Sequence, residues 1–255
     1  MHAETKPDTP SVDPAEVARY SALADRWWDS QGPFWPLHTL NRLRTAWIRD
    51  RLCHHLGRDA GAARPLEGLS VVDIGCGGGL LSEPLARLGA RVHGVDVTEG
   101  NIAVARLHAA DSGLEITYEV VSAEALAARG AFYDVVLNME VVEHVADLPG
   151  FMAACNRLLR PGGHGFIATL NRTPASFIAG IIGAEYLLRW LPRGTHQWRR
   201  FRRPGELETL LDRDGIRVIG RTGVRVNPLN RRMTLTRSMA VNYMLMTQRP
   251  GRETA

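Results

Sequence analysis

Apolar residues recur at helical spacing in the first part of the chain. From Glu16 to Trp28, and again from Leu37 to Leu56, they fall three or four positions apart. This spacing predicts two helices before any strand. Gly32 and Pro33 separate the two helices, and the segment Gly57–Gly68 lacks such a pattern, so it is predicted to be a loop.

Further along, short apolar runs alternate with helical segments. The predicted strands are 69–74, 91–95, 115–121, 132–138, 164–170, 216–221 and 241–247, and the predicted helices among them are 80–88, 99–111, 145–159 and 204–212. Strands that alternate with helices favour a parallel sheet covered by helices on both faces. We therefore predict an α/β, Rossmann-like fold with a seven-stranded, mostly parallel sheet, preceded by N-terminal helices.

The predicted domain organisation is simple. A polar, proline-containing tail at 1–14 is expected to be disordered. The remainder, 15–255, has the length of one large domain. The segment 171–203 interrupts the alternation after the fifth strand and is predicted to be an insertion that faces the substrate or a membrane.

Composition limits the possible surroundings of the protein. The three cysteines (Cys53, Cys76 and Cys155) are too few and too scattered for a disulfide framework, so a reducing interior suits them. No apolar run is long enough to cross a bilayer. The net charge is only +4, although the basic residues are arginines apart from Lys6. A cytoplasmic location is expected, with peripheral membrane contact left open.

The glycine-rich segment Asp73–Gly79 follows the first predicted strand. Ligands of such sheets bind beyond the carboxyl ends of the strands, and glycine allows a tight turn and close approach of a ligand. A glycine-rich turn alone is weak evidence, because dinucleotide-binding folds also use one. However, Gly75, Gly77 and Gly79 are spaced by two, and Asp73 precedes the turn, which differs from the dinucleotide pattern.

An aspartate at the end of the second strand strengthens this interpretation. Asp96 lies 21 residues after Gly75, where a carboxylate can accept hydrogen bonds from ribose hydroxyls. Ser122, Ala123 and Glu124 follow the third strand, where contacts to adenine are expected. The alternative is a purely structural turn beside a surface aspartate.

Three motifs resemble class I S-adenosylmethionine-dependent methyltransferases, namely Asp73–Gly79, Asn138–Val145 and Leu159–Gly163. Further segments resemble the O-methyltransferases of ubiquinone biosynthesis, and these are Pro36–His38, Thr169–Arg172, Gly183–Tyr186, Pro192–His196 and Val241–Leu245. The resemblance implies methyl transfer from S-adenosylmethionine to a polyprenylated catechol and to demethylubiquinol. By matching position, it assigns cofactor binding to Arg44, Gly75, Asp96 and Met139. We add Asp73, Gly77 and Glu124 as cofactor residues from their place around the turn.

The loop after the fourth strand carries the candidate catalytic residues Glu140, Glu143 and His144. A phenol with a pKa of about 10 is a poor nucleophile at neutral pH. A histidine can accept its proton as general base, or a divalent ion can lower the pKa of catechol oxygens. The three side chains could supply metal ligands, and the resemblance suggests Mg²⁺, although a histidine is unusual for that ion. Alternatively, they form an acidic cluster that stabilises a helix N-terminus.

The insertion has an apolar part followed by a basic part. No acidic residue occurs between Tyr186 and Gly205. The apolar residues are Phe177, Ile178, Ile181, Ile182, Leu187, Leu188, Trp190 and Leu191, and the arginines are Arg189, Arg193, Arg199, Arg200, Arg202 and Arg203. This pattern favours contact of 175–203 with an anionic membrane, at the inner face of the cytoplasmic membrane, where a polyprenylated phenol or quinol substrate would reside. Alternatively, the segment is a hairpin packed only on protein. Nucleic acid is disfavoured because few aromatic residues interleave the arginines; other enzymes of ubiquinone biosynthesis are possible partners.

The sequence also raises three other functions. Methyltransferases that act on amino groups of nucleic acids or proteins resemble one another in an Asn/Asp-Pro-Pro-aromatic motif after strand four, whereas this chain has Asn138–Val141 there. A non-catalytic binding protein on the same fold would be expected to lose Asp96 or the group at 140–144. Methylation of another hydrophobic catechol or phenol is the nearest alternative.

Overall fold

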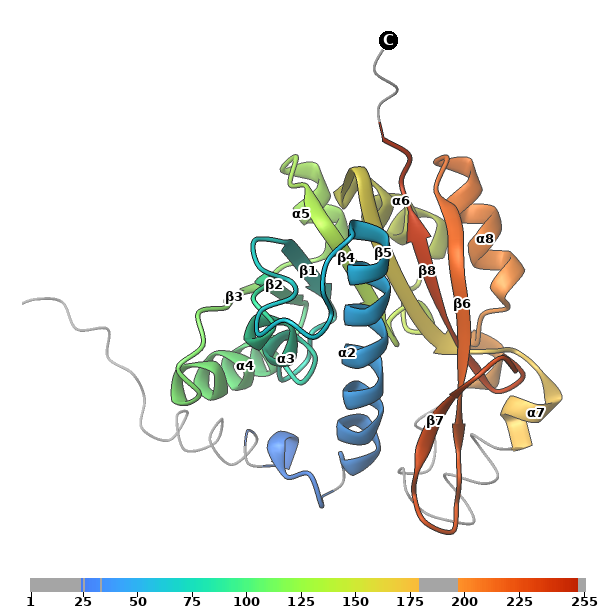
Figure 1. Cartoon of the computed structure of the whole chain (residues 1–255). Coiled ribbons are helices and arrows are strands. Elements are labelled where there is room, and N and C mark those ends of the chain that lie inside the picture. The colour runs from blue at the N-terminus through green and yellow to red at the C-terminus, as the bar shows by residue number, and fades with distance from the viewer. Residues whose placement is uncertain (1–23, 25, 33, 179–196, 252–255) are drawn as a thin grey trace, which may run out of the picture.

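The computed structural model describes residue 24 and residues 26–32, 34–178 and 197–251. Within these residues one eight-stranded sheet has the order β3-β2-β1-β4-β5-β8-β6-β7 (Figure 1). The strands are β1 (Ser70–Ile74), β2 (Arg91–Asp96), β3 (Thr117–Val120), β4 (Tyr133–Met139), β5 (Leu159–Leu170), β6 (Arg217–Val226), β7 (Met233–Thr236) and β8 (Asn242–Gln248). The helices are α2 (Trp35–Leu56), α3 (Ser82–Arg87), α4 (Glu99–Asp111), α5 (Ala123–Ala128), α6 (Leu148–Leu158), α7 (Pro174–Ser176), α8 (Pro204–Arg213) and the 3₁₀ turn η2 (Trp198–Arg200).

The strand pairing confirms a mostly parallel α/β sheet but corrects its size. Strands β3, β2, β1, β4 and β5 are mutually parallel. Beyond β5, each strand is antiparallel to the one before it in the order β8, β6, β7. The prediction of seven strands was wrong because it omitted β7. This edge strand alternates apolar and polar residues, but it has only four residues and none is fully buried, so the pattern is too short to indicate a strand by itself.

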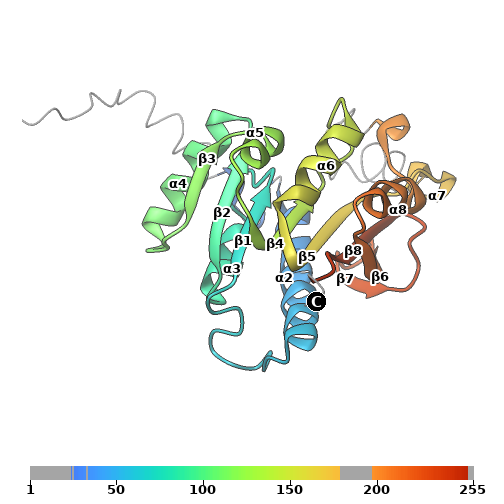
Figure 2. The same cartoon turned by 90° about the horizontal axis from the view of Figure 1, so that it is seen from above.

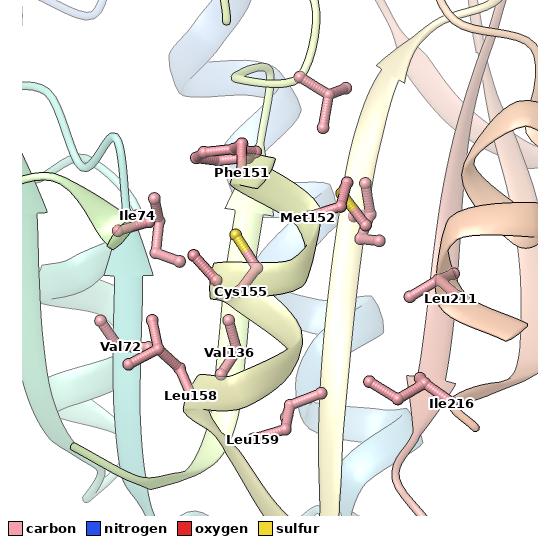
Figure 3. Close-up of a cluster of buried hydrophobic side chains, with 14 of the residues drawn as sticks. Val72, Ile74, Val136, Phe151, Met152, Cys155, Leu158, Leu159, Leu211 and Ile216 are labelled. Atoms are coloured by element: carbon pink, nitrogen blue, oxygen red, sulfur yellow. The ribbon is translucent and has the colours of Figure 1, made fainter. Parts of the chain in front are cut away.

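The two faces of the sheet bury different side chains because neighbouring residues of a strand point in opposite directions. Val71 and Val135 pack with Trp47 and Leu52 of α2 and with Leu85 of α3. On the opposite face, α5, α6 and α8 cover the sheet (Figure 2). There α6 contributes a row of apolar side chains against β1 and β4, namely Phe151, Met152, Cys155 and Leu158 (Figure 3).

Two predicted boundaries moved for local reasons. Helix α6 starts at Leu148 rather than Val145, because the Asp147 side chain accepts a hydrogen bond from Gly150 N at 3.1 Å and caps the helix there. Strand β5 starts at Leu159 rather than His164, since Leu159 pairs with Tyr133 across an irregularity in the ladder.

The strand order determines where a ligand would lie. Because β2, β1 and β4 are adjacent and parallel, Asp96, Ile74 and Met139 end at the same edge of the sheet. At the end of β5 the chain leaves the sheet, and it returns where Arg202 N donates to Leu170 O at 3.2 Å. The residues 179–196 of the predicted insertion lie outside the described part of the chain.

Candidate active site

The glycine turn connects β1 to α3 and lies against the end of β2. Gly75, Gly77 and Gly79 have φ angles of 70°, 54° and 86°, a region that side chains with a Cβ rarely adopt. Gly75 N and Cys76 N both donate to Val95 O, at 2.7 and 3.0 Å. The turn is therefore held against the end of β2, as a cofactor cradle requires. Burial raises the pKa of the Cys76 thiol, which keeps it protonated.

Asp96 is held in place by three donors. Its carboxylate accepts hydrogen bonds from Gly77 N at 3.1 Å, Thr98 N at 2.8 Å and Asn101 Nδ2 at 3.3 Å. These bonds connect the glycine turn to the start of α4 and fix the orientation of the carboxylate. The position, at the carboxyl edge of the sheet, agrees with the expected role in binding ribose hydroxyls.

Asp73 supports the turn from within the protein. Its side chain is 2% exposed and accepts a hydrogen bond from Ser82 Oγ at 2.7 Å, at the first residue of α3. Burial raises the pKa of Asp73 to about 6. The contact to Ser82 indicates that Asp73 orders the turn.

Two tryptophans, which the sequence did not mark as site residues, cover the glycine turn. Trp28 Nε1 donates to Gly78 O at 3.1 Å, and the Trp28 ring stacks on His108 with centroids 3.5 Å apart. The Trp27 ring lies so close to Gly77 that a Cβ there would be 2.9 Å from it. The apolar spacing of residues 16–28 indicated only a helix; the available signal was the pair of adjacent tryptophans, whose side chains point in different directions from a helix.

We expect the Trp27→Ala variant to bind S-adenosylhomocysteine about tenfold more weakly, because it loses an aromatic wall worth roughly 1.4 kcal/mol or more on burial. Trp27→Phe retains a ring that can stack on Phe34, as Trp27 does at 4.4 Å, and should stay close to the parent. Isothermal titration of both variants measures the difference. Equal affinities for the alanine and phenylalanine variants would show that the ring does not enclose the cofactor.

Arg44 connects the long helix α2 to the loop after β4. The guanidinium is 2% exposed, forms an ion pair with Glu140 Oε1 and donates to Asn41 Oδ1 at 3.3 Å. Glu140 has a φ of 61°, and its N–H donates to Ala168 O at 2.8 Å. A non-glycine residue in this region costs about 1 kcal/mol or more, so surrounding contacts must hold it there. The loop is thus fixed from two sides.

Glu143 and His144 are neighbours in the loop with opposite environments. Glu143 is 3% exposed and accepts a hydrogen bond from Thr169 Oγ1 at 2.8 Å, whereas His144 is exposed. Burial first, and the charge of Glu140 second, raise the pKa of Glu143 to about 9. At neutral pH Glu143 is therefore a neutral acid, whereas the His144 side chain lies at the surface of the loop.

The predicted Mg²⁺ ligand set Glu140, Glu143 and His144 is not assembled in this structure. Among the described residues, no three His, Cys, Asp or Glu side chains are grouped so that they could hold a metal ion. Glu140 is engaged by Arg44, and Glu143 favours its protonated form, which is a poor ligand. The residues as arranged do not fit the ion.

Two other predicted cofactor residues occupy different surroundings. Met139 ends β4 and is 9% exposed, so it lines the same edge as the glycine turn. Glu124 is exposed in the first turn of α5, where Ser122 caps the helix by accepting from Ala125 N at 3.2 Å. A contact of Glu124 with the cofactor stays a prediction.

Comparison with known proteins identifies the family of this chain. The methyltransferase domain family matches residues 72–167, which span β1 to β5. A ubiquinone biosynthesis O-methyltransferase from Sinorhizobium fredii is 53% identical over 94% of this chain and 97% of that protein. One from Chelativorans is 54% identical over 95% of this chain and 96% of that protein. This chain belongs to the ubiquinone biosynthesis O-methyltransferase family.

Membership in the ubiquinone biosynthesis O-methyltransferase family confirms the relationship indicated by the sequence motifs. Among solved structures, magnesium protoporphyrin IX methyltransferase from Synechocystis with bound SAH has a TM-score of 0.62 and 23% identity, and the match covers 93% of this chain and 100% of that one. At that identity the likeness supports the fold, and it agrees with the mostly parallel sheet described above. The individual roles predicted for residues of the site remain predictions.

Proposed function

We propose that this protein transfers the methyl group of S-adenosylmethionine to a phenolic hydroxyl of polyprenylated catechol and demethylubiquinol intermediates. The observation that carries the proposal is the identity above 50% with ubiquinone biosynthesis O-methyltransferases along nearly the whole chain. The cradle formed by the glycine turn and Asp96 supports it, since its oriented carboxylate suits a ribose. Another hydrophobic catechol or phenol is the alternative substrate.

The chemistry requires a positioned oxygen and a proton acceptor. As the phenolic oxygen attacks the methyl carbon, the new O–C bond forms and the S–C bond breaks, leaving neutral S-adenosylhomocysteine. We assign the phenolic proton to the imidazole of His144, which is exposed at the carboxyl end of β4. Arg44 and Glu140 hold the loop, and in-line positioning supplies much of the acceleration.

We also propose that the protein acts at the inner face of the cytoplasmic membrane. The described part of the chain contains no helix that is long and apolar enough to span a bilayer. The two ends of the predicted membrane segment 175–203 that the structure describes support contact with a membrane surface. At one end Phe177 and Ile178 are 41% and 60% exposed, and at the other end Arg199 and Arg200 are exposed. Other enzymes of the pathway are possible partners there.

One assay tests the reaction. Purified protein is incubated with labelled S-adenosylmethionine and a short-tailed polyprenyl catechol, demethylubiquinol or a tail-less catechol, with and without a chelator. We expect label in the two prenylated substrates. Label only in the tail-less catechol would favour the alternative substrate, and no label in any condition would overturn methyl transfer. Loss of label with chelator would show that a metal binds in an arrangement that differs from this structure.

A matched pair of variants tests the proton acceptor. His144→Ala should lower kcat by about 100-fold or more while leaving cofactor affinity unchanged, because general bases typically contribute that much. His54→Ala removes an equally exposed imidazole on α2 and should have no effect. If the two variants turn over at similar rates, His144 is not the base.

A further inference from the structure

A cavity of about 580 Å³ lies between the N-terminal half of α2 and the turn that joins β6 to β7. Its volume falls within the range of roughly 300–1,000 Å³ typical of small-molecule sites. Helix α2 lines the cavity with residues spaced three or four apart, including Trp35, Thr39 and Arg42. Arg44, which pairs with Glu140, points from a different face of the same helix. The cavity is therefore separate from the site described above.

The cavity is rich in positive charge. Arg42, Arg231 and Arg232 line it, and no carboxylate does. Within the described residues, none of these arginines forms an ion pair. Arg231 stacks over the Trp35 ring at 4.8 Å, and Arg42 donates to Thr39 Oγ1 at 3.3 Å. Such contacts orient the guanidinium groups without neutralising them, which favours an anionic ligand.

The surrounding sequence extends this charge. Residues 215–252, which include β6, β7 and β8, contain no aspartate or glutamate but eight arginines. An anion at the cavity is thus attracted by its lining and by the strands beside it, and no carboxylate of this segment opposes it.

An apolar residue projects beside the arginines. Leu229, at the tip of the β6–β7 turn, is 94% exposed. The turn is ordered by its own side chains: Asn227 Oδ1 accepts from Leu229 N at 2.9 Å, and Asn230 Oδ1 accepts from Arg232 N at 3.0 Å. Figure 1 shows this hairpin extending beyond the sheet beside the N-terminal end of α2. The turn therefore presents a fixed leucine next to a basic cavity.

We propose that this cavity binds the phosphate group of an anionic membrane lipid, with Leu229 inserted among the acyl chains. The inference deepens the proposed membrane contact and rests on it, but it uses residues outside 175–203. A basic cavity beside an exposed apolar tip suits a lipid surface, which offers a phosphate and hydrocarbon together. It suits a nucleic acid less, because Arg231 covers the aromatic ring of Trp35 on which a base would stack.

Vesicle binding by a pair of charge-matched variants tests the proposal. Wild-type protein is sedimented with phosphatidylcholine vesicles, with or without phosphatidylglycerol. Each arginine near an anionic surface changes binding by about fivefold, so R231Q/R232Q should bind the phosphatidylglycerol vesicles about 25-fold more weakly. R213Q/R217Q removes the same charge at the end of α8 and the start of β6, away from the β6–β7 turn; both arginines are exposed, and this variant should lose little.

A second measurement reports on insertion independently of charge. The cysteines Cys53, Cys76 and Cys155 are buried, so L229C can be labelled selectively with an environment-sensitive fluorophore. We expect a blue shift of its emission on phosphatidylglycerol vesicles and none on pure phosphatidylcholine.

Several results would overturn the lipid site. One is an equal loss of vesicle binding in R231Q/R232Q and R213Q/R217Q. Another is the absence of an emission shift of labelled L229C on vesicles that bind the protein. A third is an RNA oligomer that displaces the vesicles from wild-type protein but does not bind R231Q/R232Q. If wild-type protein binds no anionic vesicle, both this site and the wider membrane proposal fail, whereas the labelling assay for methyl transfer is unaffected.

Discussion

Replacing Asp96 with asparagine should raise the dissociation constant for S-adenosylhomocysteine by about 100-fold. The carboxylate accepts hydrogen bonds from Gly77 N and Thr98 N, and an asparagine would direct an NH₂ group at one of these donors. Hydrogen bonds to a charged group contribute about 1.5–3 kcal/mol each, and the change would weaken both the turn and the ribose contact. Isothermal titration measures the affinity.

A matched control separates this effect from the loss of one negative charge. Asp111→Asn changes an exposed aspartate at the far end of the same helix, α4, and should leave the affinity unchanged. If Asp96→Asn binds the cofactor as tightly as this control, Asp96 serves only to order the turn and the ribose role is wrong.

The cofactor side of the site was predictable because its determinants are local. The glycines at alternate positions impose the turn, and the end of each apolar run indicates where a strand stops. In a parallel sheet, strand ends meet at one edge, so the sequence could assign Asp96 and the glycine turn to one cofactor site. In the structure, a hydrogen bond from Gly77 N to the Asp96 carboxylate connects the turn to the end of β2.

The remainder of the site depends on contacts that no local pattern encodes. Arg44 and Glu140 are 96 residues apart, and only the way α2 packs across the sheet brings them together. Likewise, Glu143 and His144 are adjacent in sequence, yet one is buried against Thr169 and the other is exposed. Residue type suggested a set of three metal ligands, whereas burial gives the two carboxyl groups and the imidazole different surroundings.

Helix α2 links the candidate active site to the proposed lipid site. Arg44 on one face holds the loop after β4, while Trp35 and Arg42 on another face line the basic cavity. A lipid phosphate bound at that cavity would hold the helix that carries Arg44 at the membrane surface. The cofactor edge of the sheet would then face the phase in which a polyprenylated substrate resides.

Glu143→Gln should make the protein increasingly more stable than the parent as pH rises. Burial raises the pKa of Glu143 to about 9, above the usual value of 4.5, so the folded protein holds a proton that the unfolded chain releases. The stability that the parent gains from holding this proton is fully present below pH 4.5, where Glu143 is protonated in both states. It is lost progressively as the pH rises from 4.5 toward about 9. In that window the free energy of unfolding of the parent falls by roughly 1.4 kcal/mol per pH unit, whereas glutamine, a neutral isostere, does not titrate.

Urea unfolding at several pH values between about 6.5 and 8.5 measures the contribution of Glu143 to the free energy of unfolding. Asp73, whose pKa is raised only to about 6, is ionised in the folded and the unfolded protein over this range. Glutamine can still accept from Thr169 Oγ1, so its advantage over the parent should widen steadily, by roughly 1.4 kcal/mol for each pH unit across the range. Glu115→Gln, at an exposed position, should follow the parent throughout. If the stability difference between Glu143→Gln and the parent stays constant with pH, Glu143 is ionised in the folded protein, and its carboxylate would again be available as a metal ligand.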